Sequence, residues 1–212
     1  MAYDFLDHLA TPSVRDAQAA NGVGELWESL DGDYPSSRFT AREAAFIALR
    51  DSFYLASVSQ SGWPYIQHRG GPPGFLVVLD DTTLGFADYR GNRQYISLGN
   101  VAADNRVALF LMDYPGRKRL KMLAHMTPHD LKAEPDLAAR LATPGYRALA
   151  ERGFTLRLDA FDWNCPQHIV PRFTGPEVDA AVAPLLARLA LLALLEAENA
   201  ELRRPGATLE KI

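Results

Sequence analysis

Apolar and polar residues alternate along the middle of the chain in a way that predicts β-strands joined by tight turns. Three hairpins are predicted, over residues 53–69, 74–87 and 105–126, followed by a further strand over Gly153 to Trp163. In that last strand Phe154, Leu156 and Leu158 share one face, which indicates a strand buried on one side. Short strands connected by hairpins favour an antiparallel barrel or sandwich over a parallel sheet.

Helical patterns flank and interrupt these strands. Residues 13–30 suit a helix that Gly22 and Gly24 weaken, since each glycine costs about 1 kcal/mol relative to alanine. The sequence Thr40-Ala-Arg-Glu43 is a capping box and predicts that a short helix starts there. Further helices are expected over residues 92–103, within residues 131–150, and after a second capping box at residues 174–177. The chain is thus predicted to be one domain, residues 1–212, with helical additions at 1–50 and 174–204.

The last helix is unusually apolar. It carries apolar residues at spacings of four and three, and further leucines widen the apolar face: Val178, Val182, Leu185, Leu189 and Leu192, with Leu186, Leu191, Leu194 and Leu195. A helix with so wide an apolar face is buried on more than one side, and a partner subunit is a natural second wall, so we expect a homodimer. The stretch Val182 to Leu195 contains Pro184 and Arg188 and is expected to be too short to span a bilayer, so no membrane partner is predicted.

Composition excludes several classes of function. The 212 residues carry a net charge of −4, without the basic footprint of a nucleic-acid-binding domain. The one cysteine, Cys165, precludes an internal disulfide, and the first ten residues lack the pattern of a signal peptide, so a cytoplasmic location is expected. His125 and His129 have the spacing of a helical metal pair, but Pro128 lies between them and the preceding residues are predicted to form a strand, so no metal site is expected.

Two loops could bind an anion. The segment from His68 to Gly74 places two glycines beside Arg69, which allows a ligand to approach the backbone closely, although a rigid connecting loop explains it equally well. In the second loop, Asn92, Arg93 and Gln94 are expected at the start of a helix, where free amides and the helix dipole attract phosphate. An ordinary capped helix is the alternative there.

Two further segments carry unusual chemistry. One face of a predicted strand would carry three cations, Arg117, Arg119 and Lys121, which repel one another unless an anion or carboxylates pair with them. The alternative is that this segment is the solvated tip of a hairpin. The segment from Asp162 to Arg172 supplies an aromatic side chain and several amides, which suit a flat heterocycle, or else form a proline-fixed corner. Cys165 with His168 is a weak candidate for a thiol nucleophile, because spacing alone shows no base within reach of the sulfur.

In this order, the four segments resemble the pyridoxamine 5'-phosphate oxidase-like family of FMN-binding split barrels, over about residues 40–172. The closest resemblance is to an uncharacterised subgroup that shares the run Trp163-Asn-Cys-Pro-Gln-His168. The resemblance implies a six-stranded antiparallel split β-barrel, mainly β with flanking helices, that forms a homodimer with FMN at the interface. It also implies an FMN-dependent oxidoreductase with a small-molecule substrate or electron donor. A non-catalytic flavin- or haem-type binding protein is the alternative, because split barrels host both roles.

The same resemblance implies the cofactor-binding residues. The ring would lie against His68, Arg69, Gly70, Gly71, Pro72 and Phe75, with Ala87 and Asp88 reaching the ring or the ribityl chain. The phosphate would be held by Asn92, Arg93, Gln94 and Arg119. The site would be closed by Trp163, Asn164, Cys165, Pro166 and Gln167, from the other subunit. The oxidase itself usually has a lysine where this chain has Gln94, so pyridoxamine phosphate is not the expected substrate, and no catalytic side chain is assigned.

Overall fold

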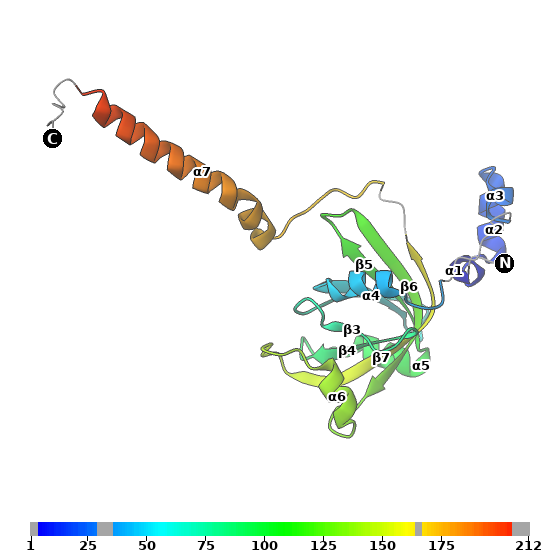
Figure 1. The fold of residues 1–212 in the computed structure, drawn as a ribbon. Coiled ribbons are helices and arrows are strands. Elements are labelled where there is room, and N and C mark those ends of the chain that lie inside the picture. The colour runs from blue at the N-terminus through cyan, green and yellow to red at the C-terminus, as the bar shows by residue number, and fades with distance from the viewer. Residues whose placement is uncertain (1–3, 29–35, 164–166, 205–212) are drawn as a thin grey trace. The chain divides into compact units, whose positions relative to one another are not determined.

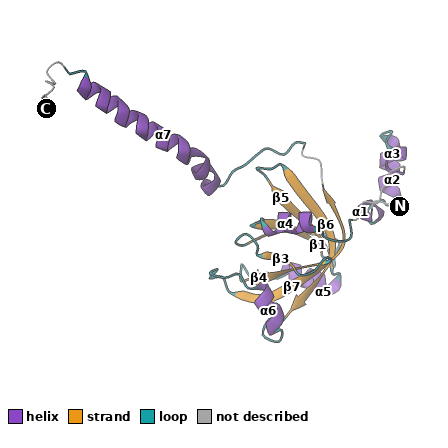
Figure 2. Cartoon of the chain, in the orientation of Figure 1, coloured by secondary structure: helices purple, strands orange, loops and turns teal. Residues whose placement is uncertain are grey.

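The computed structural model describes residues 4–28, 36–163 and 167–204 (Figure 1). The chain divides into two compact units, residues 1–169 and 170–212, and the expectation of one domain over the whole chain stays a prediction. The first unit is built on seven antiparallel strands that form one sheet in the order β2-β1-β5-β6-β7-β4-β3 (Figure 2). The strands are β1 Ser52–Val58, β2 Pro64–Gly70, β3 Leu76–Val78, β4 Thr83–Tyr89, β5 Arg106–Asp113, β6 Lys118–His129 and β7 Ala150–Trp163.

The antiparallel split-barrel class expected from the sequence is confirmed in outline, but the strand count is not. The resemblance implied six strands, whereas the described residues contain seven, as many as the hydrophobic pattern itself predicts. The additional short strand is β3, whose three residues pair only with β4 at one edge of the sheet. At the opposite edge, Arg69 on β2 forms an ion pair with Asp88 on β4, so the curled sheet brings its two ends together.

The inner face of the curled sheet forms a continuous apolar core. Its largest fully buried side chains include Phe53, Phe75, Phe86 and Phe154, which contact one another ring to ring. Every second residue of β1 and of most of β6 is buried, as the alternating pattern predicts, whereas five consecutive residues of β4 are buried. This strand is covered on its second face by α6, where a Cβ on Gly85 would lie 2.7 Å from Leu141.

The first unit contains six helices among its described residues. They are α1 Asp4–Asp7, α2 Pro12–Ala20, α3 Gly24–Glu28, α4 Ala41–Ala48, α5 Ile96–Ala103 and α6 Pro135–Leu141. The capping box at Thr40 and Glu43 is formed as predicted. The single helix expected over residues 13–30 was wrong, because Gly22 adopts a left-handed φ of 70° and separates α2 from α3.

Two other helix boundaries differ from the sequence-based expectation. The helix expected over residues 92–103 begins only at Ile96, because Arg93 and Tyr95 both have left-handed backbone conformations that a right-handed helix excludes. Within residues 131–150 only α6 is helical, between the two prolines that were expected to interrupt it. As a result, Asn92, Arg93 and Gln94 lie in a loop before the helix and not in its first turn.

The second unit consists mainly of α7, Gly175–Leu202, whose capping box at Thr174 and Glu177 is formed as predicted. None of its residues is buried, including its nine large leucine and valine side chains between Val178 and Leu195. By length and composition alone this helix could cross a membrane, since an 18-residue window has a mean hydropathy of 2.0. The expectation that the apolar stretch is too short was therefore wrong as an argument from length, because the helix extends well beyond residues 182–195.

Candidate functional site

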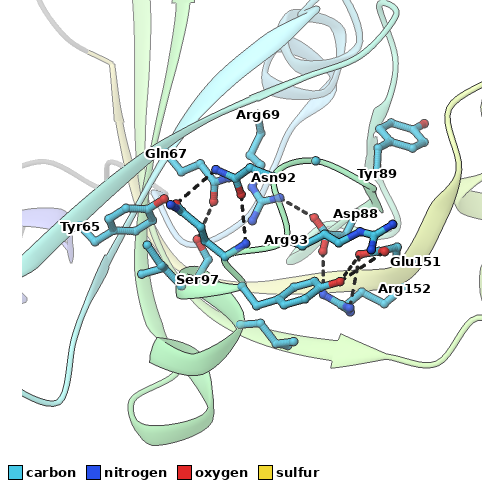
Figure 3. Close-up of a pocket in the computed structure, with 15 residues that line it drawn as sticks. Tyr65, Gln67, Arg69, Asp88, Tyr89, Asn92, Arg93, Ser97, Glu151 and Arg152 are labelled. Carbon is cyan, nitrogen blue, oxygen red and sulfur yellow. Dashed lines mark hydrogen bonds and ion pairs between the residues drawn. The ribbon is translucent and has the colours of Figure 1, made fainter.

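A polar pocket lies where the two ends of the sheet meet (Figure 3). The empty space between its lining residues is about 420 Å³, and part of that space is open solvent. The end of β4, the loop after it, the start of α5 and the start of β7 form one side, and β2 forms the other. The lining residues are Tyr65, Gln67, Arg69, Asp88, Tyr89, Gly91, Asn92, Arg93, Gln94, Tyr95, Ile96, Ser97, Leu98, Glu151 and Arg152.

A buried carboxylate organises the arginines of this pocket. One oxygen of Asp88 accepts a hydrogen bond from Arg69, and the other accepts one from Arg152 at 3.0 Å. All three side chains are at most one-fifth exposed, so this is a largely desolvated cluster of two cations and one anion. The Nε of Arg69 is also buried and has no hydrogen-bond partner in the structure, which leaves a donor that an acceptor group could satisfy.

The loop between β4 and α5 brings further donors to the pocket. The amide N–H of Gln94 donates to the Asn92 side chain at 3.1 Å, and the Asn92 amide donates to the Gln94 side chain. Arg93 is exposed and forms no ion pair with any residue that the structure describes. The N-cap of α5, Tyr95, offers no side-chain acceptor, so the first amides of this eight-residue helix are not capped by a side chain.

Glu151 faces the same loop from β7. It accepts hydrogen bonds from Arg90 at 2.9 Å and from the Tyr95 hydroxyl at 3.2 Å. The hydrogen bond from Arg90 holds the pKa of Glu151 below its ordinary value and outweighs the opposing effect of burial, with Tyr95 contributing in the same direction. The carboxylate is thus ionised at neutral pH, and its negative charge balances the positive charge of Arg90 beside the pocket.

On the far side of the pocket, β2 presents three polar side chains at alternate positions, Tyr65, Gln67 and Arg69. Gln67 accepts a hydrogen bond from the buried hydroxyl of Ser97 in the first turn of α5 at 2.9 Å, which ties the helix to the strand. Figure 3 shows Gln67 and Arg69 directed toward the loop that carries Asn92. The chemistry of the pocket is therefore that of a cradle for a small anion with hydrogen-bond acceptors.

The pocket brings together five of the residues expected to bind the cofactor, namely Arg69, Asp88, Asn92, Arg93 and Gln94. It also contains residues that the sequence analysis did not single out for the site: Tyr65, Gln67, Tyr95, Ser97, Glu151 and Arg152. Tyr65 and Gln67 share the strand face of Arg69, a period-2 signal that was present in the sequence. Glu151 and Arg152 meet the others only through the β4–β7 pairing, for which no local signal exists.

The other residues expected around the ring do not line this pocket. His68 lies on the opposite face of β2 from Arg69 and contacts Tyr54 edge to face. Phe75 is a core residue stacked on Phe53, and Gly71 lies so close to it that a Cβ would be 2.7 Å from the ring. Gly70 and Pro72 are the chain neighbours of Gly71, and Ala87 is buried in the sheet. Their expected role at a flavin ring stays a prediction.

Trp163, Gln167 and Arg119 do not line the pocket either. The Trp163 indole N–H donates to the Glu43 carboxylate at 2.7 Å, and its ring packs edge-on against Phe46, so it joins β7 to α4. Asn164, Cys165 and Pro166 are outside the described residues, and Gln167 is exposed. Arg119 lies on β6 with its Nε buried and without a hydrogen-bond partner, a second donor of the kind found in Arg69.

The curled antiparallel sheet, with an arginine-lined pocket at its seam, has the architecture of a split β-barrel. The chain belongs to the pyridoxamine 5'-phosphate oxidase family, whose family model matches residues 39–153, more than half of its length. The matched region contains the whole pocket, so the family resemblance noted from the sequence is confirmed. A search of curated proteins gives no match.

Solved structures with a similar fold are distant in sequence. A putative pyridoxamine 5'-phosphate oxidase from Lactobacillus delbrueckii is 21% identical, with a TM-score of 0.46 over 61% of this chain and 97% of that one. An FMN-binding protein from Syntrophomonas wolfei is 14% identical, with a TM-score of 0.44 over 72% and 95%. An F420 reductase is 19% identical, with a TM-score of 0.39 over 55% and 93%. The family assignment rests on the matched family model.

Proposed function

We propose that this protein binds FMN and is an FMN-dependent oxidoreductase. The observation that supports this most directly is the gathering of Arg69, Arg93 and Arg152 with the start of α5 around one pocket. A phosphate group suits this cradle, because arginine donors and helix amides are the usual partners of phosphate oxygens. The unpartnered Nε of Arg69 is a donor that a bound anion would satisfy.

In this proposal the phosphate end of the cofactor lies against Arg69, Asn92, Arg93 and Gln94. When bound, FMN supplies a ring that accepts and passes on electrons, and the protein supplies binding, orientation and charge. Asp88 neutralises part of the charge of Arg69 and Arg152. The remaining positive charge therefore suits one phosphate group and not a ligand with several negative groups. The same proposal includes a phosphate-binding role for Arg119 and a closing role for residues 163–167. It also includes a ring-facing role for His68, Gly70, Gly71, Pro72, Phe75 and Ala87.

We also propose that the protein is a cytoplasmic homodimer with no membrane or nucleic-acid partner. An apolar run extends along α7 from Ala180 to Leu195. Arg188 stands near its middle, and acidic residues flank both ends. A second copy of the helix covers these leucines without burying that charge in lipid.

Absorbance of the purified protein tests the central claim. The expected result is a yellow protein with the bands of oxidised flavin, or a colourless protein that acquires them on addition of FMN. A protein that takes up no FMN contradicts the proposal. Catalysis is tested separately, by mixing the flavoprotein anaerobically with NADPH, NADH or reduced deazaflavin. Bleaching of the flavin supports an oxidoreductase, and failure with every donor favours the alternative of a cofactor-binding protein.

A further inference from the structure

The pairing of β4 with β7 is irregular at one position beside the pocket. Asp88 pairs with Arg152, but the next residue of β4, Tyr89, pairs with Ala150, so Glu151 has no partner in the ladder. This is a β-bulge, in which one additional residue stands on β7. Successive side chains of a regular strand point to opposite faces, yet Glu151 and Arg152 both line the pocket. The bulge thus places two opposite charges at one site.

Glu151 contacts both ends of the loop that precedes α5. Arg90, at the start of the loop, donates its Nε–H to one carboxylate oxygen at 2.9 Å, and its backbone N–H donates to the carbonyl of Leu149 at 2.9 Å. Tyr95, at the end of the loop, donates its hydroxyl to the same carboxylate at 3.2 Å. The ring of Tyr95 also lies 5.0 Å from the guanidinium carbon of Arg152.

The loop held in this way has a costly backbone. Arg93 has a φ of 61° and Tyr95 a φ of 52°, and neither is a glycine. Left-handed conformations of such residues are energetically unfavourable and persist only where surrounding contacts impose them. Tyr95 is also the N-cap of α5, so its conformation sets where the helix begins and where Arg93 lies relative to the first helical amides.

We propose that Glu151 is a positioning residue that holds the Arg90–Tyr95 loop in its phosphate-binding conformation. The inference rests on the proposed function, since it assigns the orientation of the same site. Charge alone predicts the opposite effect, because an anionic side chain at an anion site weakens binding by repulsion. Glu151 offsets this by accepting hydrogen bonds from Arg90 and Tyr95, which leaves Arg93 as the cation free to meet the ligand.

The affinities of FMN and riboflavin, measured by flavin fluorescence, test this inference because the two ligands differ only in the phosphate. In Glu151→Gln the FMN affinity is expected to fall about tenfold, the loss that follows when a charge-assisted hydrogen bond is weakened, while riboflavin affinity changes less than about twofold. Tyr95→Phe removes only the hydroxyl donor and is expected to act in the same direction to a smaller extent. Asp104→Asn, which neutralises an exposed carboxylate paired with Arg106 outside the pocket, is the matched control and is expected to change neither affinity.

The outcomes are distinguishable. If wild-type protein binds FMN more tightly than riboflavin and the ratio falls in Glu151→Gln and in Tyr95→Phe, the positioning role is supported. If the ratio is unchanged or rises in Glu151→Gln, repulsion is the dominant effect and the inference is overturned while the proposed function stands. If Glu151→Gln does not fold, an unchanged ratio in Tyr95→Phe overturns it. If wild-type protein binds no FMN, or binds both ligands equally, the phosphate site and the inference fail together.

Discussion

The guanidinium of Arg69 on β2 donates to the carboxylate of Asp88 on β4, although the two strands stand far apart in the hydrogen-bonded order of the sheet. Asp88 also accepts from Arg152 on β7, so one carboxylate joins three strands at the seam of the barrel. The same cluster lines the candidate ligand pocket. Stability of the seam and shape of the site are therefore coupled through Asp88.

This coupling predicts a large effect of Asp88→Asn. The substitution leaves the largely buried guanidinium of Arg69 without its anion, and Arg152 keeps only the more distant Glu151 carboxylate at 3.7 Å. Breaking such a buried pair costs about 3 kcal/mol or more. Urea denaturation measures the free energy of unfolding. Asp104→Asn, which breaks the solvent-accessible ion pair with Arg106, is the control and is expected to cost far less. Equal losses in the two variants would show that the Asp88 cluster is not effectively buried.

Arg93→Ala is expected to weaken FMN binding by about tenfold to a hundredfold, because a hydrogen bond between charged groups contributes about 1.5–3 kcal/mol. The measurement is flavin retained after dialysis, and the dissociation constant from fluorescence. Lys118→Ala is the control, since Lys118 is an exposed cation at the β5–β6 hairpin and is outside the pocket. Equal weakening by the two substitutions would mean that net charge, and not the pocket, attracts the cofactor.

The lowered pKa of Glu43 implies that the stability of the fold decreases in acid. Burial of its carboxyl raises the pKa, but hydrogen bonds from Thr40 and from the Trp163 indole outweigh it and hold the pKa below the ordinary 4.5. Because the folded-state pKa is the lower one, the ionised carboxylate stabilises the fold above pH 4.5, and this contribution is lost as the pH falls through the folded-state pKa.

Glu43→Gln is accordingly expected to lower stability at pH 7 and to lose less stability than the wild type below pH 4.5. Unfolding free energies from urea titrations at about pH 7, 4.5 and 3 check this. Parallel curves for the two proteins would contradict the assigned shift. Glu134→Gln serves as a control, because Glu134 is an exposed carboxylate that contacts His129 away from α4.

The apolar stripe of α7 makes the dimer testable. Leu189→Lys places a charge within the stripe formed by Val178, Val182, Leu185, Leu189 and Leu192 and is expected to weaken self-association at least tenfold. Analytical ultracentrifugation of the full chain is the measurement. Ala187→Lys, half a turn away on the helix, is the control and is expected to have little effect. A monomeric wild-type protein, or one that floats with phosphatidylcholine vesicles, would refute the assignment of a second copy as the partner.

Gly71→Ala separates packing from ligand binding in the His68–Gly74 segment. The added methyl would lie 2.7 Å from the Phe75 ring, which is buried against Phe53, so a destabilisation of about 1–3 kcal/mol is expected. Thermal unfolding and FMN affinity are both measured. A stable variant with weakened FMN binding would instead favour the role of Gly71 at the flavin ring that the family resemblance implies.

Much of this architecture was predictable from short-range patterns. Apolar runs, turn residues and the alternation in residues 153–163 indicated all seven strands, and the capping boxes at Thr40 and Thr174 located the starts of α4 and α7. These signals depend on residues close together in the chain. The start of α5 was misplaced, because Arg93 and Tyr95 have left-handed conformations and Tyr95 contacts Glu151 on β7, far along the chain. Nothing in the residues around positions 92–94 reports those contacts.

The candidate site shows the same division. Arg69, Asp88, Asn92, Arg93 and Gln94 were expected, since cations and amides near a predicted helix start indicate an anion site. Glu151 and Arg152 were not, because their approach depends on the pairing of strands more than 60 residues apart. Conversely, Phe75 and Gly71 carry a recognisable local motif that the structure uses for packing.

The unpaired residue on β7 also determines how this protein should be compared with others. The bulge shifts the β4–β7 pairing by one position. A sequence alignment with a relative that lacks the bulge, made without a gap in β7, therefore matches inward-facing residues of one protein with outward-facing residues of the other. Relatives that lack the additional residue require a one-residue gap at position 151. If Glu151 positions the loop before α5, relatives that have both the additional residue and an acidic side chain at this position are expected to anchor the loop in the same way.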